Sequence, residues 1–404
     1  MSLKSLMRPV LAAALATVTL AAPLAVAQMP TAPVAPNQEQ PAPEKPSQEA
    51  PQKQDRPQIE VVFVLDTTGS MSGLLEGAKQ KIFSIASRIA TGKPTPRLKV
   101  GLVGYRDVGD EYVTKRFDLS EDLDTVFTHL RQFRADGGGD TPEHVGRGLG
   151  EAVSKMSWSD SRQTMKIIFL VGDAPPAERG DPWSFKTWAQ AARERRIVVN
   201  TVRCGRDAET ATAWKYVAKL TDGTFDTIGQ EGGMLAVATP YDAELAKVNA
   251  EIATKTLYTG SAAVQAANRG RAAQMAALAP EAAAERISYM KKARSGGSAA
   301  RAKAASSAPV AVGGAVDLVE KPEALASVDA KELPTELQGL KKEQQAAKVK
   351  QLADERKALE EKAAKLAADR DAWRAKNVAE KKDSFDDNVM KSVRAQAASY
   401  GVAY

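Results

Sequence analysis

The stretch Ile59-Glu60-Val61-Val62-Phe63-Val64-Leu65-Asp66-Thr67-Thr68-Gly69-Ser70-Met71-Ser72 decides the fold of this chain. Its first half is almost entirely apolar and rich in β-branched residues, which is typical of a strand covered on both faces in a parallel sheet. A polar turn follows directly, and a helical pattern then runs from 72 to 90. A buried strand, a polar turn and a helix in this order predict the first unit of an alternating strand and helix domain.

The same alternation continues downstream. Apolar runs bounded by turn residues indicate further strands, and helical patterns lie between them, with right-handed crossovers expected. The fold class is therefore α/β, with a doubly wound, mostly parallel, Rossmann-like sheet over 59–232 and an Ala-rich helical region after it. The sheet is expected to close near residue 230. The further strands are expected at 98–103, 167–171, 197–202 and 224–228.

Three loops of this domain carry the chemistry. In an open α/β sheet, ligands bind beyond the carboxyl ends of the strands. Asp66, Thr68 and Ser70 follow the first strand, Asp173 follows the strand at 167–171, and the segment 137–143 (GGGDTPE) precedes a helix. Carboxylate and hydroxyl oxygens on one edge suit a hard cation such as Mg²⁺.

Each loop also has a purely structural interpretation. Asp, Thr and Ser before a helix are common caps, and Thr141-Pro142-Glu143 reads as a helix start. Asp173 alone is a turn residue. The three loops together favour a metal site, and the composition restricts its ligands. A lone cysteine, Cys204, and two histidines leave oxygen as the main ligand, and Cys204 itself reads as a packed strand residue.

Over about 58–230 the sequence resembles the von Willebrand factor A domain with its metal-ion-dependent adhesion site. The family pattern Asp-x-Ser/Thr-x-Ser is met by Asp66, Thr68 and Ser70. The segment Asp140-Thr141-Pro142-Glu143 is similar to the hemicentin-like and integrin β-like branch, as is Gly104-Tyr105-Arg106-Asp107, in which Asp107 is given no ligand role.

The resemblance implies roles for these residues. Glu143 would approach the metal, Asp140 would assist or serve a neighbouring ion, and Asp173 would hold a metal-bound water. In the other branch a threonine does this work, which keeps Thr141 as a competing candidate. The cofactor implied is Mg²⁺, with Ca²⁺ or Mn²⁺ as alternatives. The function implied is non-enzymatic: binding of a protein ligand whose acidic side chain completes the metal shell.

The N-terminal region indicates export from a bacterial cell. Lys4 and Arg8 precede an apolar stretch over 10–24, and Ala25-Val26-Ala27 offers small residues to a signal peptidase. We expect a signal peptide over 1–27, cleaved before Gln28, and a periplasmic or secreted protein. An uncleaved membrane anchor is the alternative. The Pro-rich segment 28–58 reads as a disordered linker, and no transmembrane segment is expected after signal removal.

The second half is predicted to be helical. Residues 241–294 read as one or two helices, 295–330 as a flexible linker, 333–376 as a long charged helix and 377–404 as a tail helix. Leu352, Leu359, Leu366 and Trp373 recur every seven residues, but the companion positions hold Arg356, Ala363 and Arg370. This pattern leaves two interpretations open, a self-associating coiled coil and an isolated or back-folded helix. The closing stripe of Phe385, Val389, Val393 and Tyr400 could dock on the globular half or on a partner.

Other functions fit the sequence less well. The chain has 56 basic and 50 acidic residues, and no basic cluster is interleaved with aromatics, so nucleic acid is not an expected partner. A haloacid-dehalogenase-type phosphatase needs a second Asp two residues after its nucleophile, where this chain has Thr68. No phosphate-binding loop motif is present. A third hypothesis is an envelope tether that acts through its helical second half.

Overall fold

The computed structural model describes residues 56–139, 141–180, 182–230, 237–295, 307–377 and 385–404. The expected signal peptide, nearly all of the Pro-rich linker and Asp140 lie outside these segments. A six-stranded sheet with the order β3-β2-β1-β4-β5-β6 forms the centre of the domain. All neighbouring strands are parallel except β3, which runs antiparallel to β2. The strands are β1 Gln58–Asp66, β2 Arg97–Tyr105, β3 Thr114–Ser120, β4 Thr164–Gly172, β5 Val198–Cys204 and β6 Phe225–Ile228.

The structure confirms the predicted fold class and all five predicted strands. The strand that the sequence did not reveal is β3, whose residues TKRFDLS are mostly partly or fully exposed. It is an edge strand, so it lacks the continuous apolar run of a central strand. Its charged side chains also discourage pairing with another chain.

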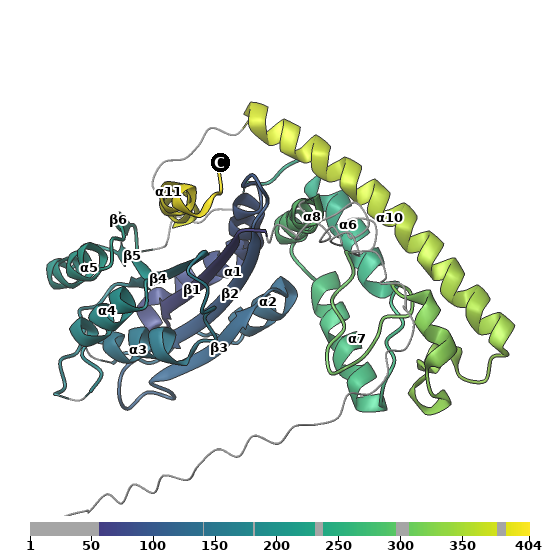
Figure 1. Cartoon of the computed structure of the whole chain (residues 1–404), viewed down its shortest axis with the longest axis horizontal. Helices are drawn as coiled ribbons and strands as arrows, with labels where there is room; N and C mark the ends of the chain where they lie inside the picture. The colour runs from purple at the N-terminus through teal and green to yellow at the C-terminus, as the bar shows by residue number, and fades with distance from the viewer. Residues whose placement is uncertain (1–55, 140, 181, 231–236, 296–306, 378–384) are drawn as a thin grey trace, which may run out of the picture. The chain divides into compact units, whose positions relative to one another are not determined.

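Helices cover both faces of the sheet (Figure 1). Alternate side chains of β1 serve the two faces: Phe63 and Leu65 belong to one buried cluster, and Val62 and Val64 to the other. Helices α1 and α2 pack in the first cluster, and α3, α4 and α5 in the second. Their bounds are α1 Ser72–Ile89, α2 Leu123–Leu130, α3 Val145–Lys155, α4 Phe185–Glu194 and α5 Ala208–Leu220.

The first face of the sheet is completed by α11 (Phe385–Ala397), from the far end of the sequence. The ring of Phe385 lies 6.0 Å from that of Phe63, and Val389 and Val393 join the same buried cluster. The predicted stripe therefore docks on the globular half of its own chain. The last strand of the sheet ends at Ile228, in agreement with the expected end of the domain near residue 230. The hydrophobic core does not end there, because it includes side chains of α11 from Phe385 onward. The short helix η5 (Ala398–Tyr400) follows α11.

The region 241–294 was expected to hold one or two helices and contains three: α6 Asp242–Thr254, α7 Ala262–Ala276 and α8 Pro280–Ser295. The breaks have local causes. Ser261 caps α7 by accepting a hydrogen bond from the backbone of Val264, and Pro280 starts α8.

The expected flexible linker over 295–330 is wrong for its described part, 307–330. Leu318 and Val319 are buried, and the Asp317 carboxylate accepts a hydrogen bond of 3.0 Å from the backbone of Leu257. The segment is rich in small residues, so the sequence did not indicate that Leu318 and Val319 pack against neighbouring elements. Short helices continue the path: η2 Pro322–Ser327, η3 Ala330–Glu332 and η4 Thr335–Leu337.

The long charged helix α10 spans Lys342–Asn377. It begins nine residues after the expected start at residue 333. Its heptad positions face the chain's own helices. Arg356 forms an ion pair of 2.5 Å with Asp317, and Arg370 pairs with Asp242 at 2.6 Å. Ala363, one heptad from each arginine, is buried with α6 and α8. The back-folded interpretation is therefore correct, and buried ion pairs account for the arginines in the seam. No helix of the described segments is long and apolar enough to cross a membrane.

Candidate metal-binding site at the carboxyl ends of the strands

Asp66, the last residue of β1, is fully buried at the edge where the parallel strands end. Its Oδ1 accepts two hydrogen bonds from Thr68, 2.9 Å from the backbone nitrogen and 2.6 Å from Oγ1. The hydroxyl of Ser70 lies 3.3 Å from that of Thr68. One carboxylate and two hydroxyls therefore form a connected group in the first loop.

The capping interpretation of this loop is not supported. The short helix η1 (Gly69–Met71) begins after Thr68, but Thr68 makes no side-chain capping bond. Helix α1 begins after Met71, whose side chain cannot cap it. The hydroxyl of Thr68 bonds to Asp66 instead, and that of Ser70 lies beside it.

The loop after β4 lies beside the first loop because β4 pairs directly with β1. Gly172 leaves room there for two side chains: a Cβ at its position would lie 2.2 Å from the Tyr105 hydroxyl oxygen and 3.3 Å from Oδ2 of Asp66. The half-buried carboxylate of Asp173 accepts a hydrogen bond from Nε2 of Gln230, which also donates to the Ser70 carbonyl at 3.4 Å. Gln230 thus links the two loops.

The loop before α3 closes over the same place. The backbone nitrogen of Gly69 donates to the carbonyl of Gly137 at 3.2 Å. A Cβ on Gly138 would lie 2.7 Å from Cβ of Thr68 and 3.1 Å from Oε1 of Glu143. Gly138, with φ of 72°, is therefore the spacer around which Glu143 approaches Thr68.

Glu143 is also held by the loop after β4. Its backbone nitrogen donates to the Pro175 carbonyl at 3.0 Å, and its carbonyl accepts from Ala177 at 2.7 Å. Helix α3 begins only at Val145, so the interpretation of Thr141-Pro142-Glu143 as a helix start is wrong. Thr141 itself is exposed.

Burial and mutual repulsion perturb two carboxylates of the site. Burial raises the pKa of Asp66 to about 7 against the opposing effect of its bonds to Thr68, and the nearby charge of Asp173 adds to the rise. Burial raises the pKa of Glu143 to about 8, with further contributions from Asp66, Asp107, Asp110 and Asp173. Acidic groups so placed are stabilised as anions by an added positive charge.

Two oxygen atoms show where such a charge would bind. Oδ2 of Asp66 and Oε2 of Glu143 are buried and have no hydrogen-bond partner. Buried oxygens without partners are costly, and a cation between the loops would satisfy both. The residues present therefore fit a divalent cation. In the described segments, no three acidic, histidine or cysteine side chains could hold a metal by themselves, so the hydroxyls would complete the donor set.

Cys204 and His129, two of the three soft or nitrogen ligands of the chain, lie in other environments. Cys204 is buried, and burial raises the pKa of its thiol, as expected for a packed strand residue. The ring of His129 stacks on Phe117 with 4.1 Å between centroids.

Sequence reasoning missed several supporting residues. Asp110 accepts a hydrogen bond of 3.1 Å from the backbone of Gly138 and so fixes the glycine loop. Arg106 donates to the carbonyls of Thr67 at 3.1 Å and Arg134 at 2.8 Å, which ties two of the three loops together. Asp107 is buried; its Oδ2 pairs with Arg179, and its Oδ1 has no hydrogen-bond partner among the described residues. The Gly-Tyr-Arg-Asp motif was noted in the sequence, but the sequence did not indicate that its arginine connects two loops of the site.

Comparison with known proteins identifies the kind of domain to which this part of the chain is similar. A model of the von Willebrand factor A domain matches residues 60–239. An ariadne-like RING finger protein, R811, of Acanthamoeba polyphaga mimivirus is 26% identical over 123 residues, which are 30% of this chain and 12% of that protein. The alpha-protein kinase vwkA of Dictyostelium discoideum is 24% identical over 120 residues, 29% of this chain and 18% of that protein. The chain spans less than a fifth of the length of these curated relatives.

Among solved structures, a von Willebrand factor type A protein from Catenulispora acidiphila is 17% identical, with a TM-score of 0.34 over 43% of this chain and 39% of that chain. The family match and the observed sheet define the class of the globular part. Residues 60–239 form a von Willebrand factor A domain, a class of domain that commonly serves in protein interaction and adhesion.

Proposed function

We propose that this domain binds a divalent cation, Mg²⁺ in the first instance, and uses it to hold a carboxylate of a protein partner. The observation that carries the proposal is the pair of buried oxygens without partners, Oδ2 of Asp66 and Oε2 of Glu143, on loops held together at one edge of the sheet. Ca²⁺ and Mn²⁺ have similar oxygen preferences and are the alternatives.

The candidate ligands differ in burial, and this difference suggests their positions in the site. Asp66, Thr68 and Glu143 are buried and would form the floor of the site, while Ser70 is exposed and Asp173 half-buried at its rim. The cation would be bound by these oxygens together with one carboxylate oxygen of the partner. Of the two candidates in the second loop, Glu143 is preferred to Thr141. Gly138 lies close to both Glu143 and Thr68, whereas the side chain of Thr141 is exposed. Asp140 keeps the assisting role that the family resemblance gives it.

A non-enzymatic role follows from the same donors. Thr68 stands where a phosphatase of this general design needs a second carboxylic acid, and its hydroxyl is bonded to Asp66. An exported bacterial protein, periplasmic or secreted, is part of the proposal, and it is supported by the N-terminal sequence pattern alone.

The test measures metal binding and partner capture together. Mg²⁺, Mn²⁺ and Ca²⁺ are titrated into the full chain by calorimetry, and the immobilised chain is used to capture proteins from its native cell envelope with and without EDTA. Asp66→Ala should lose both activities. The matched control is Glu178→Ala, an exposed carboxylate in the loop after β4, which should keep both. Capture that persists in EDTA, or a wild-type chain that binds none of the three ions, would refute the proposal.

A further inference from the structure

The opposite end of the sheet carries a hollow lined by basic side chains, here called the basic hollow. It has two adjoining parts, with volumes of about 240 Å³ and 730 Å³. The larger volume lies within the range usual for small-molecule sites. Both parts share Ser161, Arg162, Thr164 and Tyr400. Lys166, Arg195 and Arg196 line one part, and Arg56 and Arg97 line the other.

The strand register fixes where the basic hollow lies. Gln58, the first residue of β1, pairs with Arg97 of β2 and Thr164 of β4, and all three line the hollow. Two carboxylates of the candidate metal site mark the other ends of these strands, since Asp66 is the last residue of β1 and Asp173 follows the last residue of β4. A strand of nine residues spans roughly 26 Å at about 3.3 Å per residue, so the two sites lie at opposite ends of the sheet.

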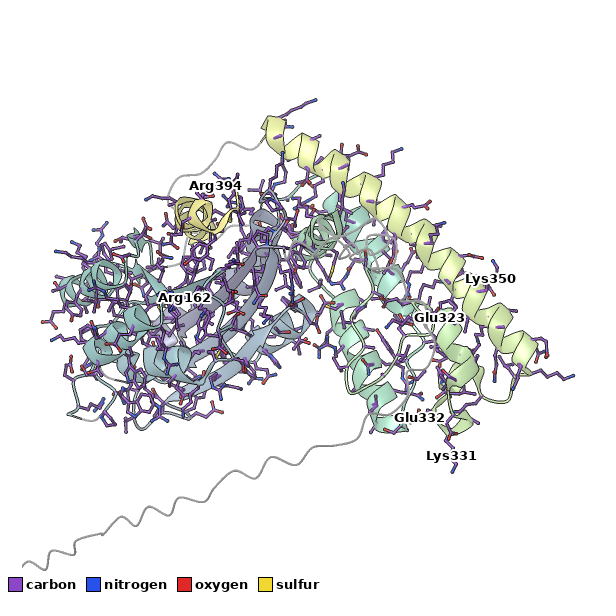
Figure 2. All side chains as sticks on the ribbon, in the orientation of Figure 1. Arg162, Glu323, Lys331, Glu332, Lys350 and Arg394 are labelled. Carbon is purple, nitrogen blue, oxygen red and sulfur yellow. The ribbon has the colours of Figure 1, made fainter. Side chains whose placement is uncertain are left out.

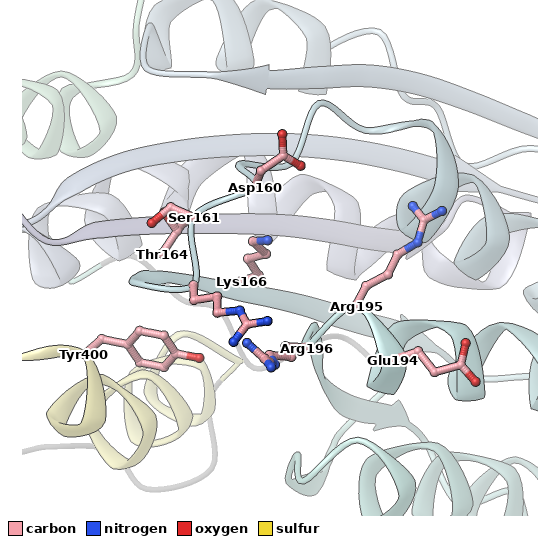
Figure 3. Close-up of a pocket in the computed structure, with 9 residues that line it drawn as sticks. Asp160, Ser161, Thr164, Lys166, Glu194, Arg195, Arg196 and Tyr400 are labelled. Atoms are coloured by element: carbon pink, nitrogen blue, oxygen red, sulfur yellow. The ribbon is translucent and has the colours of Figure 1, made fainter. Parts of the chain in front are cut away.

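Three cations of the basic hollow have no ion-pair partner among the described residues. Within the described segments, the side chains of Arg162, Lys166 and Arg196 form neither a hydrogen bond nor an ion pair. Figure 3 shows Lys166, Arg196 and Tyr400 around one opening, with the carboxylates of Asp160 and Glu194 directed away from it. Unpaired positive charges that share a hollow repel each other unless an anion is present.

The backbone at Arg196 adds an independent observation. Arg196 follows α4 with a φ of 55°, in the left-handed region. Its amide donates to the Arg193 carbonyl, and the amide of Ile197 donates to that of Ala192, both at 2.9 Å. This is the helix-ending arrangement in which glycine is usual, because a side chain is unfavourable there. An arginine at this position places its charge in the hollow at the expense of stability.

We propose that the basic hollow binds a phosphate group, as a soluble phosphate ester or as a lipid headgroup. Guanidinium groups match the oxygens of phosphate in pairs, and an ammonium adds a compact charge. Ser161 and Tyr400 line the same hollow and carry hydroxyl groups that can donate to phosphate oxygens. Binding here needs no divalent cation, so it is separate from the site at the other end of the sheet.

The experiment uses the full chain in EDTA, so the proposed metal site makes no contribution. ³¹P NMR titrations with inorganic phosphate and glycerol phosphate form one arm. Sedimentation with phosphatidylglycerol vesicles, against phosphatidylcholine vesicles, forms the other. The double variant Arg162→Ala with Arg196→Gly should reduce affinity by about tenfold or more, since charge-assisted hydrogen bonds are lost. Its thermal midpoint should stay unchanged or rise, because glycine suits the backbone of residue 196.

A charge-matched control separates the hollow from general electrostatics. Lys331→Ala with Lys350→Ala removes two cations from the C-terminal helical segments, where both are labelled in Figure 2, and should leave affinity within twofold. Binding of the soluble phosphates supports the proposal with a soluble ligand, and binding of phosphatidylglycerol vesicles alone supports it with a lipid source. No binding in either arm, or equal losses in the two double variants, would overturn it.

Discussion

The ring of Phe385 packs 6.0 Å from that of Phe63, so helix α11 contacts the middle of strand β1. The contact is reinforced around it. Asp387 pairs with Arg88 of α1 at 2.7 Å, and Ser392 lies 2.7 Å from the hydroxyl of Thr224. The core of the von Willebrand factor A domain therefore includes residues beyond the helical region that interrupts the sequence.

This packing predicts the effect of truncating Phe385. Phe385→Ala should lower the free energy of unfolding by about 3 to 5 kcal/mol, the usual cost of deleting a buried aromatic ring. Urea denaturation followed by circular dichroism measures it. Val310→Ala, at a half-exposed apolar position, serves as the control and should change stability by less than about 0.5 kcal/mol. Equal effects of the two substitutions would contradict the role of α11 in the core.

Asp66→Asn separates the stability of the site from its proposed function. Without added metal the variant should be at least as stable as the wild type, since it removes a buried charge that Asp173 repels. Mg²⁺ at a hundred times its dissociation constant should stabilise only the wild type, by about 2.7 kcal/mol. Thermal unfolding with and without Mg²⁺ distinguishes the two effects, and a wild-type midpoint unmoved by metal would count against the site.

Gly138 offers a test of the loop that carries Glu143. Gly138→Ala should destabilise the loop and weaken metal binding, because its φ is 72° and the new Cβ would meet Thr68 at 2.7 Å. Gly139→Ala is the matched control, since a Cβ there meets nothing within 4 Å. Calorimetric titration with Mg²⁺ compares the two variants. Similar affinities would show that Gly138 does not set the approach of Glu143.

A buried ion pair joins the helical region to the sheet domain. Arg286 of α8 contacts both carboxylate oxygens of Asp124 in α2, at 2.7 and 2.6 Å, and neither residue is exposed. Arg286→Ala should cost about 3 to 5 kcal/mol, because it leaves a buried carboxylate unpaired. Replacing both residues by apolar ones should cost less than the single change. A double-mutant cycle in urea measures this difference, and simple additivity of the two substitutions would refute the coupling.

The predictable part of the fold followed from burial on both sides of the central strands. The apolar runs of β1, β2, β4 and β5 can only be covered strands, and the alternation with helices then sets the order. Edge strand β3 gave no such signal, since one of its sides is open and its residues are mixed.

The candidate site was predictable where residues stand next to one another in sequence. Asp66, Thr68 and Ser70 share one loop, so their convergence could be expected from spacing. Gln230, which bridges Asp173 and Ser70, comes from a distant segment and carries no local pattern.

The packing of α10 against the chain's own helices could not be predicted from the sequence either. Its buried arginines resemble surface residues until Asp317, Asp242 and Glu285 are seen beside them. A charged position in a heptad is consistent with either exposure or a buried pair, and only the partner decides between them.

The way the chain enters and leaves the sheet domain has a practical consequence. Arg56 donates to the Thr95 carbonyl at 2.8 Å, and the hydroxyl of Tyr404 donates to the Ile89 carbonyl at 2.9 Å. Both attachment points adjoin the turn that leads into the first residue of β2. A sample coupled to a bead or sensor chip through Tyr404 would therefore display the Asp66 and Glu143 loops toward the solution, and an affinity tag after Tyr404 would not shield them.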